Sequence, residues 1–229
     1  MDYSLNQFTD KALHVFTTLI LLLSCPFSLL GQEYIYSDQE GDDKKTLRVS
    51  KSQLYDSLLL TLKSSHKYSK HSFSPPGYTK KWRMIDRDAD HNFLAERSGN
   101  EISIQGKYSG SRISKIVQID NRPWINKLDH GLSAWVKTDQ DHTSFWTLKL
   151  GSGLDPVEFE VKKTGTENLT TPAGDFEVIK VKINLDGFLV SNFWSAYLWY
   201  REEDGLFIKY QGDSGPGTSL RIIELQEIL

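Results

Sequence analysis

The sequence predicts a mainly β fold of antiparallel strands with one helix near its N-terminal end. Apolar and polar residues alternate in residues 101–107, 157–162 and 179–185, the pattern of a strand with one buried face. Asp204–Gly205 separates two apolar runs, and an Asp-Gly pair is typical of a tight turn between antiparallel strands. Residues 52–64 have helical spacing instead.

The N-terminal segment indicates export. Residues 12–31 contain no Asp, Glu, Lys or Arg, which is typical of the apolar region of a secretory signal peptide. We therefore expect residues 1–31 to be a signal peptide and residues 32–229 to be a single β-rich domain. An uncharged stretch of about 20 residues is also just long enough to span a bilayer as a retained anchor.

Two processing sites compete within this segment. Cleavage after Gly31 places a small residue at the last position of the signal, as ordinary signal peptidase prefers. Leu22–Cys25 resembles a bacterial lipobox instead, which would make Cys25 a lipidated N-terminus, although Leu23 and Pro26 fit that motif poorly. Cys25 is the single cysteine, so cleavage after Gly31 leaves a domain with neither disulfide nor thiolate metal site.

The first third of the expected domain contains the predicted helix that gives the fold class its α component. Residues 33–46 are polar and we expect them to be loose. Leu54, Leu58 and Leu62 recur every four residues, so residues 52–64 are predicted to form a helix with one apolar face.

The rest of the chain is read as strands. Residues 66–78 contain a Pro-Pro-Gly stop and are expected to be a linker. Residues 121–136 fit a loop followed by a short helix. A change of phase in the alternation suggests a bulge near Val178. Strands are predicted at residues 79–86, 101–107, 112–119, 157–162, 179–185, on both sides of the Asp204–Gly205 turn, and at 219–228.

The strand before Asp204–Gly205 is aromatic on both faces. A sheet face open to solvent would not present Tyr197 and Trp199 in succession. Either both faces are packed into a core, or one face lines a cavity for an apolar ligand. On the second interpretation the ligand-lining residues are Phe193, Tyr197, Trp199 and Phe207.

Gly212–Pro216, in single letters GDSGP, matches the nucleophile motif of trypsin-like serine proteases at four positions. Few residues follow Ser214, no histidine has the sequence context of that family's catalytic base, and Pro216 replaces a glycine of the motif. Glycines that permit positive φ, with Asp and Ser between them, form turns readily. We expect a turn, and a hydrolase using Ser214 is the remote alternative.

No metal or cofactor site is predicted. Asp86, Asp88 and Asp90 alternate as at the start of a calcium loop, but His91 occupies the position where that loop needs glycine. A solvated turn is expected there. The formal net charge is −3, and the charged residues, 25% of the chain, are spread along it without a basic block, so the sequence argues against nucleic-acid binding.

The segment around Thr171–Phe176, in single letters TPAGDF, carries a family resemblance. With the upstream Gly165 and Glu167, it resembles a stretch between two strands in a family of exported bacterial proteins known as a domain of unknown function. The similarity extends over residues 100–228. That family is related to the LolA-like lipoprotein carriers, so the resemblance implies a strongly curved sheet or incomplete β-barrel with a helical lid over an apolar groove.

These observations together give the functional expectation. We expect an exported, non-enzymatic protein of the cell envelope, in the periplasm or associated with the outer membrane, that binds a lipid, a lipoprotein or another apolar ligand in the concave face of its sheet. Membrane contact would come through the N-terminal anchor or a lipid on Cys25. The alternative is a structural or interaction module with a fully packed core.

Overall fold

In the computed structural model, the described residues, 31–54, 57–185, 194–213 and 219–229, form one antiparallel sheet of 14 strands. The strands are β1 (Gln32–Glu40), β2 (Asp43–Leu54), β3 (Ser57–Lys63), β4 (Lys67–Ser74), β5 (Tyr78–Asp86), β6 (His91–Ser98), β7 (Glu101–Tyr108), β8 (Ser111–Gln118), β9 (His142–Lys149), β10 (Asp155–Thr171), β11 (Gly174–Leu185), β12 (Ser195–Arg201), β13 (Phe207–Asp213) and β14 (Leu220–Ile228). One short helix, α2 (Leu128–Gly131), and the 3-10 helices η1 (Trp135–Lys137) and η2 (Leu150–Ser152) lie among them.

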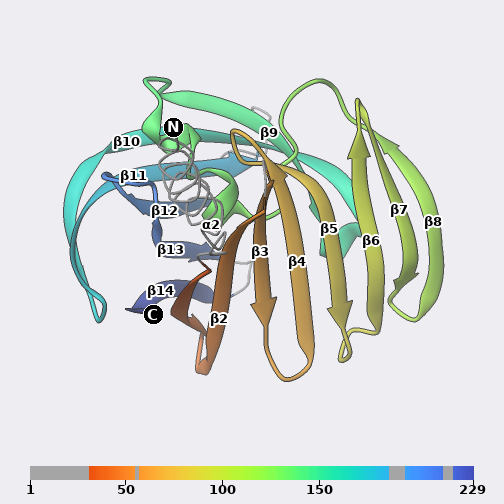
Figure 1. Ribbon diagram of the computed structural model, residues 1–229, viewed down its shortest axis with the longest axis horizontal. Helices are drawn as coiled ribbons and strands as arrows, with labels where there is room; N and C mark the ends of the chain where they lie inside the picture. Colours follow the sequence, from red (N-terminus) through yellow and green to blue (C-terminus); the bar gives the residue numbers. More distant parts are fainter. Residues whose placement is uncertain (1–30, 55–56, 186–193, 214–218) are drawn as a thin grey trace, which may run out of the picture. The chain divides into compact units, whose positions relative to one another are not determined.

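Strands β1 to β8 and β9 to β14 are two meanders joined by the pairing of β1 with β14. The two outer strands of the sheet are therefore β8 and β9, which are consecutive in the chain. Figure 1 shows β2–β8 standing in a row, with β9–β14 crossing behind them. We call the place where these two unpaired outer edges of the sheet face each other the seam. Near the seam, Lys115 Nζ of β8 donates to the carbonyl of Gly153 and to the carboxylate of Asp155, at 2.7 and 2.9 Å.

The chain between β8 and β9, residues 119–141, crosses the inner face of this curved sheet, and we call it the inner segment. Thr79 of β5 donates its N–H to the carbonyl of Trp124 at 2.8 Å. On the other side, Tyr200 of β12 donates its hydroxyl to the carbonyl of Leu128 at 2.8 Å. Because both halves of the sheet hold the inner segment, it fills much of the interior.

Two apolar clusters make up the core of the described residues. The larger one joins the inner faces of β1–β4 and β9–β14 to the inner segment through residues such as Leu60, Leu132 and Leu198. The smaller one lies between β5–β8 and the seam, around Trp82, Phe93 and Trp124. Each fully buried side chain of this size contributes about 1.5–3 kcal/mol to stability.

The predicted helix at residues 52–64 is wrong: β2 and β3 form a hairpin there, with Leu54 paired to Ser57. The leucine run fits a strand equally well, since Leu58, Leu60 and Leu62 share one face at period two. Leu60 is fully buried on that face, between Lys51 of β2 and His71 of β4. The backbone pairing on both sides of β3 outweighs the helical spacing, because helix propensity is a weak preference.

Two segments expected to lack structure are strands. Residues 33–46 belong to β1 and β2, where Tyr34 and Tyr36 are buried on the inner face. The linker expected at residues 66–78 contains β4, whose Ser69, His71 and Phe73 alternate inward. Their polar neighbours conceal this alternation in the sequence.

Other predictions are confirmed. Asp204–Gly205 forms the turn between β12 and β13, and Gly205 has φ +73°. The region 121–136 is a loop followed by α2. Asp86 closes the β5–β6 turn by accepting the N–H of Ala89 at 3.1 Å. The irregularity expected near Val178 lies instead in the partner strand β10, between Lys163 and Gly165.

Several predictions fall outside the described residues: the signal peptide and Cys25, Phe193, and Ser214–Pro216 of the protease-like motif, whose first two residues, Gly212 and Asp213, end β13. They stay predictions, as does the division into residues 1–31 and 32–229. Within the described part of the chain, no helix has the length and apolar character needed to cross a membrane.

Candidate functional site

The inner segment carries a buried polar cluster beside α2, formed with a histidine of β4; its members are His71, Lys127, Asp129 and His130. His71, Asp129 and His130 are all less than 9% exposed. Lys127 and Asp129 form an ion pair. Three polar atoms of the cluster lack a hydrogen-bond partner among the described residues: His71 Nδ1, Asp129 Oδ1 and His130 Nε2. Unsatisfied polar atoms are rare in protein interiors, and several in one place indicate room for water or a polar ligand group.

The cluster has strongly perturbed protonation. Burial lowers the pKa of His71 to about 3 and that of His130 to about 4, and the Lys127 ammonium acts in the same direction on both. Burial is the largest single effect and raises the pKa of Asp129, but the charge and hydrogen bond of Lys127, together with His130 and His71, lower it by more, so the pKa stays below its ordinary value. At neutral pH both histidines are therefore neutral and Asp129 is ionised.

A serine lies next to this cluster, so an acid–base triad has to be considered. Ser69 Oγ lies 2.8 Å from His71 Nε2, and the charge of Asp129 acts on the same histidine. Ser69 is 8% exposed, however, and its oxygen also accepts the indole N–H of Trp82 at 3.0 Å. A nucleophile must be reachable by substrate, and Ser69 lines neither of the cavities described below. We assign it a packing role.

A cavity of about 250 Å³ opens beside the buried cluster, with His130 in its lining, and we call it the lysine cavity. Its apolar wall consists of Leu58, Phe73, Pro75, Pro76 and Ala134. Three charged residues, Lys51, Lys137 and Asp204, also line the cavity, and we call them its charged border. The wall comes from β3, β4 and the turn after β4 on one side, and from the inner segment on the other.

Glycines allow the parts of this wall to approach closely. Gly77, at φ +125°, ends the Pro-Pro-Gly turn, and a Cβ there would lie 3.2 Å from the carbonyl oxygen of Gly131 in α2. Gly205 lies against the same segment, because a Cβ there would come within 2.3 Å of the Ser133 carbonyl oxygen. The β12–β13 turn and the turn after β4 thus both pack directly on the inner segment.

The charge at the border of the lysine cavity is positive. Lys51 is half-buried, and its pKa is lowered by burial and by Lys137. Asp204 opposes this effect but is held by Arg201, whose Nε and Nη2 donate to its two oxygens at 2.9 and 2.7 Å. Among the described residues, no carboxylate forms an ion pair with Lys51 or Lys137.

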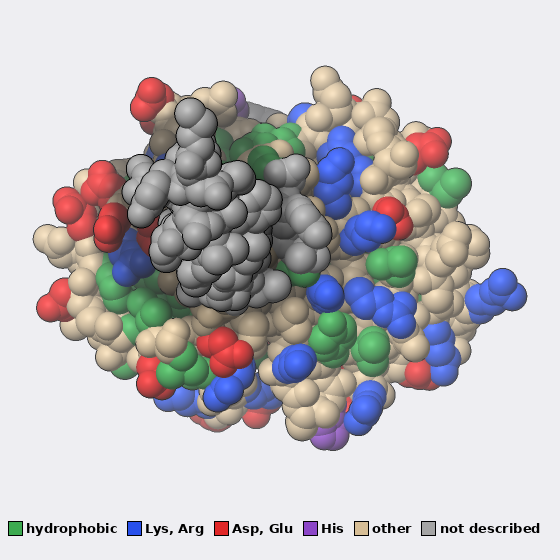
Figure 2. All heavy atoms as spheres, in the orientation of Figure 1, with side chains coloured by type: hydrophobic (Ala, Val, Ile, Leu, Met, Phe, Trp, Pro, Cys, Tyr) green, Lys and Arg blue, Asp and Glu red, His purple; other side chains and the backbone are tan. Residues whose placement is uncertain are grey.

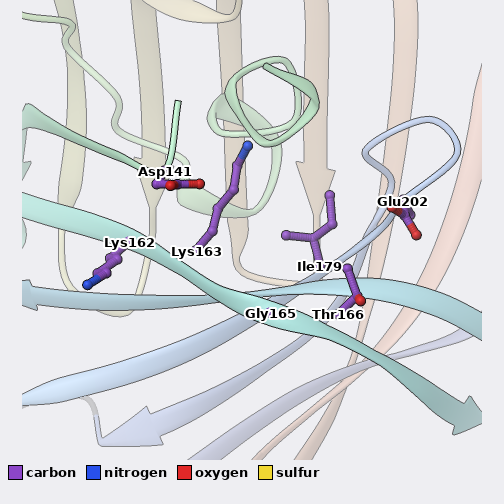
Figure 3. A pocket seen from close by; sticks show the side chains of 7 residues that line it. All are labelled: Asp141, Lys162, Lys163, Gly165, Thr166, Ile179 and Glu202. Atoms are coloured by element: carbon purple, nitrogen blue, oxygen red, sulfur yellow. The ribbon is translucent and has the colours of Figure 1, made fainter. Parts of the chain in front are cut away.

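A second cavity, of about 310 Å³, lies on the other side of the inner segment, and we call it the hairpin cavity. In Figure 3 the Lys163 side chain points toward the coil above β10, whereas Lys162 points away. Lys163 Nζ lies 5.3 Å from the centre of the Trp135 ring and donates to the carbonyl of Thr138. Asp141, Glu202 and Thr166 also line this cavity, where Ile179 is the one apolar side chain among the described lining residues, whereas five apolar residues line the lysine cavity.

The residues predicted from the sequence to line a ligand site are mostly in the core. Trp199 is 5% exposed and Phe207 1% exposed, while Tyr197 is half-buried. Lys180 lies 5.1 Å from the ring centres of both Tyr197 and Trp199. Phe207 faces the other way, and its ring centre is 6.4 Å from that of His130. None of these three lines either cavity, so their contact with a ligand stays a prediction.

Sequence reasoning missed the residues that form the lysine cavity. Lys51 was placed before the expected helix, and His71 was placed in the expected linker. The alternation of Ser69, His71 and Phe73 was the available signal for a strand, and it would have turned His71 inward. Nothing local in the sequence indicates that Lys51 and Lys137 meet, because their positions depend on pairing across the whole sheet.

No family model matches the chain, and no curated protein matches it. It is similar in fold to a β-barrel-like protein of the domain of unknown function DUF1849 from Brucella abortus, with a TM-score of 0.53, 10% identity, and coverage of 86% of this chain and 96% of that one. Comparison with the hypothetical lipoprotein YmcC from Escherichia coli K12 gives a TM-score of 0.41 at 8% identity, over 98% of each chain. At these identities the first similarity supports a barrel-like fold alone, and the second carries no argument.

Proposed function

We propose that this is an exported, non-enzymatic envelope protein that holds a lipid or another apolar chain against the inner face of its curved sheet. The observation that carries the proposal is the lysine cavity, where an apolar wall lies beside buried polar groups without partners. Concave apolar sites with a few converging polar groups are the usual sites of small-molecule binding. The resemblance of residues 100–228 to proteins related to LolA-like carriers agrees with a ligand of this kind.

The size of the cavity limits the ligand. Its volume of about 250 Å³ lies just below the range of roughly 300–1,000 Å³ that is usual for ligand sites. A single short chain, or the end of a longer one, fits this volume better than a complete diacyl lipid does.

Export supports the same function, because lipids of the envelope would be the available ligands. The proposal of export is based on the uncharged residues 12–31. The exported protein would be either released into the periplasm by cleavage after Gly31 or lipidated at Cys25. Protein labelled with radioactive palmitate and then fractionated would distinguish the two routes, since label on the wild type that is lost in Cys25→Ser indicates lipidation.

The binding proposal is tested on purified protein. We expect organic-solvent extracts to contain a stoichiometric apolar compound by mass spectrometry, or the empty protein to bind fatty-acid and phospholipid probes. Leu58→Trp, which narrows the apolar wall, should reduce probe binding, whereas a change at the exposed Ile116 should not. An empty protein that also ignores both classes of probe would refute the proposal.

A structural or interaction module with a packed core is the second candidate. The inner segment favours it, because Trp124, Leu132 and Val136 fill the interior where an open groove was expected. Leu58 and Leu62 also pack against the larger core cluster. On this account both cavities hold water, and the probe experiment gives no binding.

A further inference from the structure

We propose that the lysine cavity selects single-chain amphiphiles that end in an anionic head group, with Lys51 and Lys137 as the head-group contacts. This inference rests on the proposed function and specifies its ligand. It starts from the position of two cations at the border of a cavity whose wall is apolar.

The first step is the charge of the border. Lys51 and Lys137 both line this cavity. Burial lowers the pKa of Lys51, Asp204 raises it, and Lys137 lowers it further. The Arg201 guanidinium already binds Asp204 through two hydrogen bonds. The described charges around the cavity therefore leave an excess of positive charge, and an anion placed there would relieve the repulsion between the two lysines.

The second step is the cost of leaving Lys51 unpaired. Lys51 points to the inner face of β2, because it is paired across the sheet with Leu60, which is fully buried. Removing an ammonium from water without a counter-charge is costly, so residues of this type are normally paired when buried. Asp204 lines the same cavity and acts on Lys51 at a distance, but no described carboxylate forms an ion pair with Lys51, and a ligand anion would supply that direct contact.

The third step concerns the deep end of the cavity. His130 is neutral at physiological pH, and its Nε2 has no partner among the described residues. A neutral imidazole adds no further positive charge, but it can donate or accept one hydrogen bond. The cavity thus offers charge at its border, an apolar wall along Leu58 and Phe73, and one neutral polar group, which matches a chain with a single anionic end.

The proposal is tested by calorimetric titration with ligands of equal chain length and different head groups: decanoate, decyl phosphate, methyl decanoate and decylamine. A hydrogen bond to a charged group strengthens binding by about tenfold or more. We expect decanoate or decyl phosphate to bind at least that much more tightly than methyl decanoate, and decylamine to bind most weakly. The comparison of the two anions identifies a carboxylate or a phosphate as the preferred head group.

The variant K51Q/K137Q should lose the preference for anions while it binds methyl decanoate as the wild type does. K45Q is the matched control, because Lys45 lies on the same strand and its side chain is 71% exposed. Raising the ionic strength from about 0.1 M to about 1 M, which shortens the Debye length from about 10 Å to about 3 Å, should weaken anion binding in the wild type.

The outcomes separate this inference from the proposed function. Equal binding of decanoate, decyl phosphate and methyl decanoate, or an anion preference that survives in K51Q/K137Q, overturns the inference and leaves the proposed function standing. If none of the four ligands binds, both fail. The comparison among ligands on the wild type needs no variant, so the test does not depend on how K51Q/K137Q folds.

Discussion

Two of the buried histidines, His71 and His130, should make the protein lose stability between pH 7 and pH 5. The pKa of His71 is lowered to about 3 and that of His130 to about 4, from an ordinary value near 6.5. Between pH 6.5 and these lowered values, the unfolded chain binds protons that the folded chain does not. Stability therefore falls as the pH falls through this interval. At pH 5 the expected loss is about 2 kcal/mol for each histidine and about 4 kcal/mol for the pair.

The neighbouring carboxylates do not mask the loss of stability that the two histidines cause between pH 7 and pH 5. Asp129, the charge nearest to both rings, has a lowered pKa and stays ionised throughout it. Asp86 and Asp204 also have lowered pKa values, so protonation reduces their stabilising contribution only below about pH 4.

The assay is urea unfolding at pH 7, 6 and 5 at constant ionic strength. His130→Gln should show about half of the wild-type loss between pH 7 and pH 5, because one of the two imidazoles with a lowered pKa is removed. His142→Asn is the matched control, since that side chain is 64% exposed, and it should retain the full loss. A wild-type protein equally stable at pH 7 and pH 5, or a His130→Gln variant with the full loss, would refute the reasoning.

Two substitution pairs test the fold. Gly205→Ala should destabilise by at least about 2 kcal/mol, since φ is +73° and the new Cβ would lie 2.3 Å from the Ser133 carbonyl oxygen. Gly99→Ala, at φ +58° with nothing within 4 Å, should cost only about 1–2 kcal/mol, and equal losses would contradict the packing of the turn. Leu60→Ala should cost about 2–5 kcal/mol in thermal or urea unfolding. Leu59→Ala, on the opposite face of β3, should cost clearly less, and a reversed order would contradict the strand assignment.

The sequence predicted the fold class because strands with one buried face alternate locally. The Asp204–Gly205 turn was also readable, since turn chemistry is a property of two neighbouring residues. The helix at residues 52–64 was wrong because a dense leucine run satisfies both periods, and the choice depends on strands that pair with it. Buried Tyr34 and Tyr36 in β1 were missed for a related reason: polar neighbours concealed the strand.

The candidate site was harder to predict than the fold. Phe193, Tyr197, Trp199 and Phe207 were chosen for their aromatic character, which marks burial as readily as it marks ligand contact. The lysine cavity instead combines β2, β4, the inner segment and the β12–β13 turn, so its existence depends on how distant segments pack. Whether Lys51 has an ion-pair partner likewise depends on how distant segments pack, and a sequence does not contain that information.

The central claim, that an acyl chain occupies the lysine cavity, is tested most directly by crystallography with a bromine-labelled fatty acid. Crystals of the protein grown with 10-bromodecanoate should show an anomalous bromine peak beside the apolar wall of Leu58 and Phe73, with the carboxylate toward Lys51. Bromine bound elsewhere, or a lysine cavity that contains only ordered water at saturating ligand, would contradict the account.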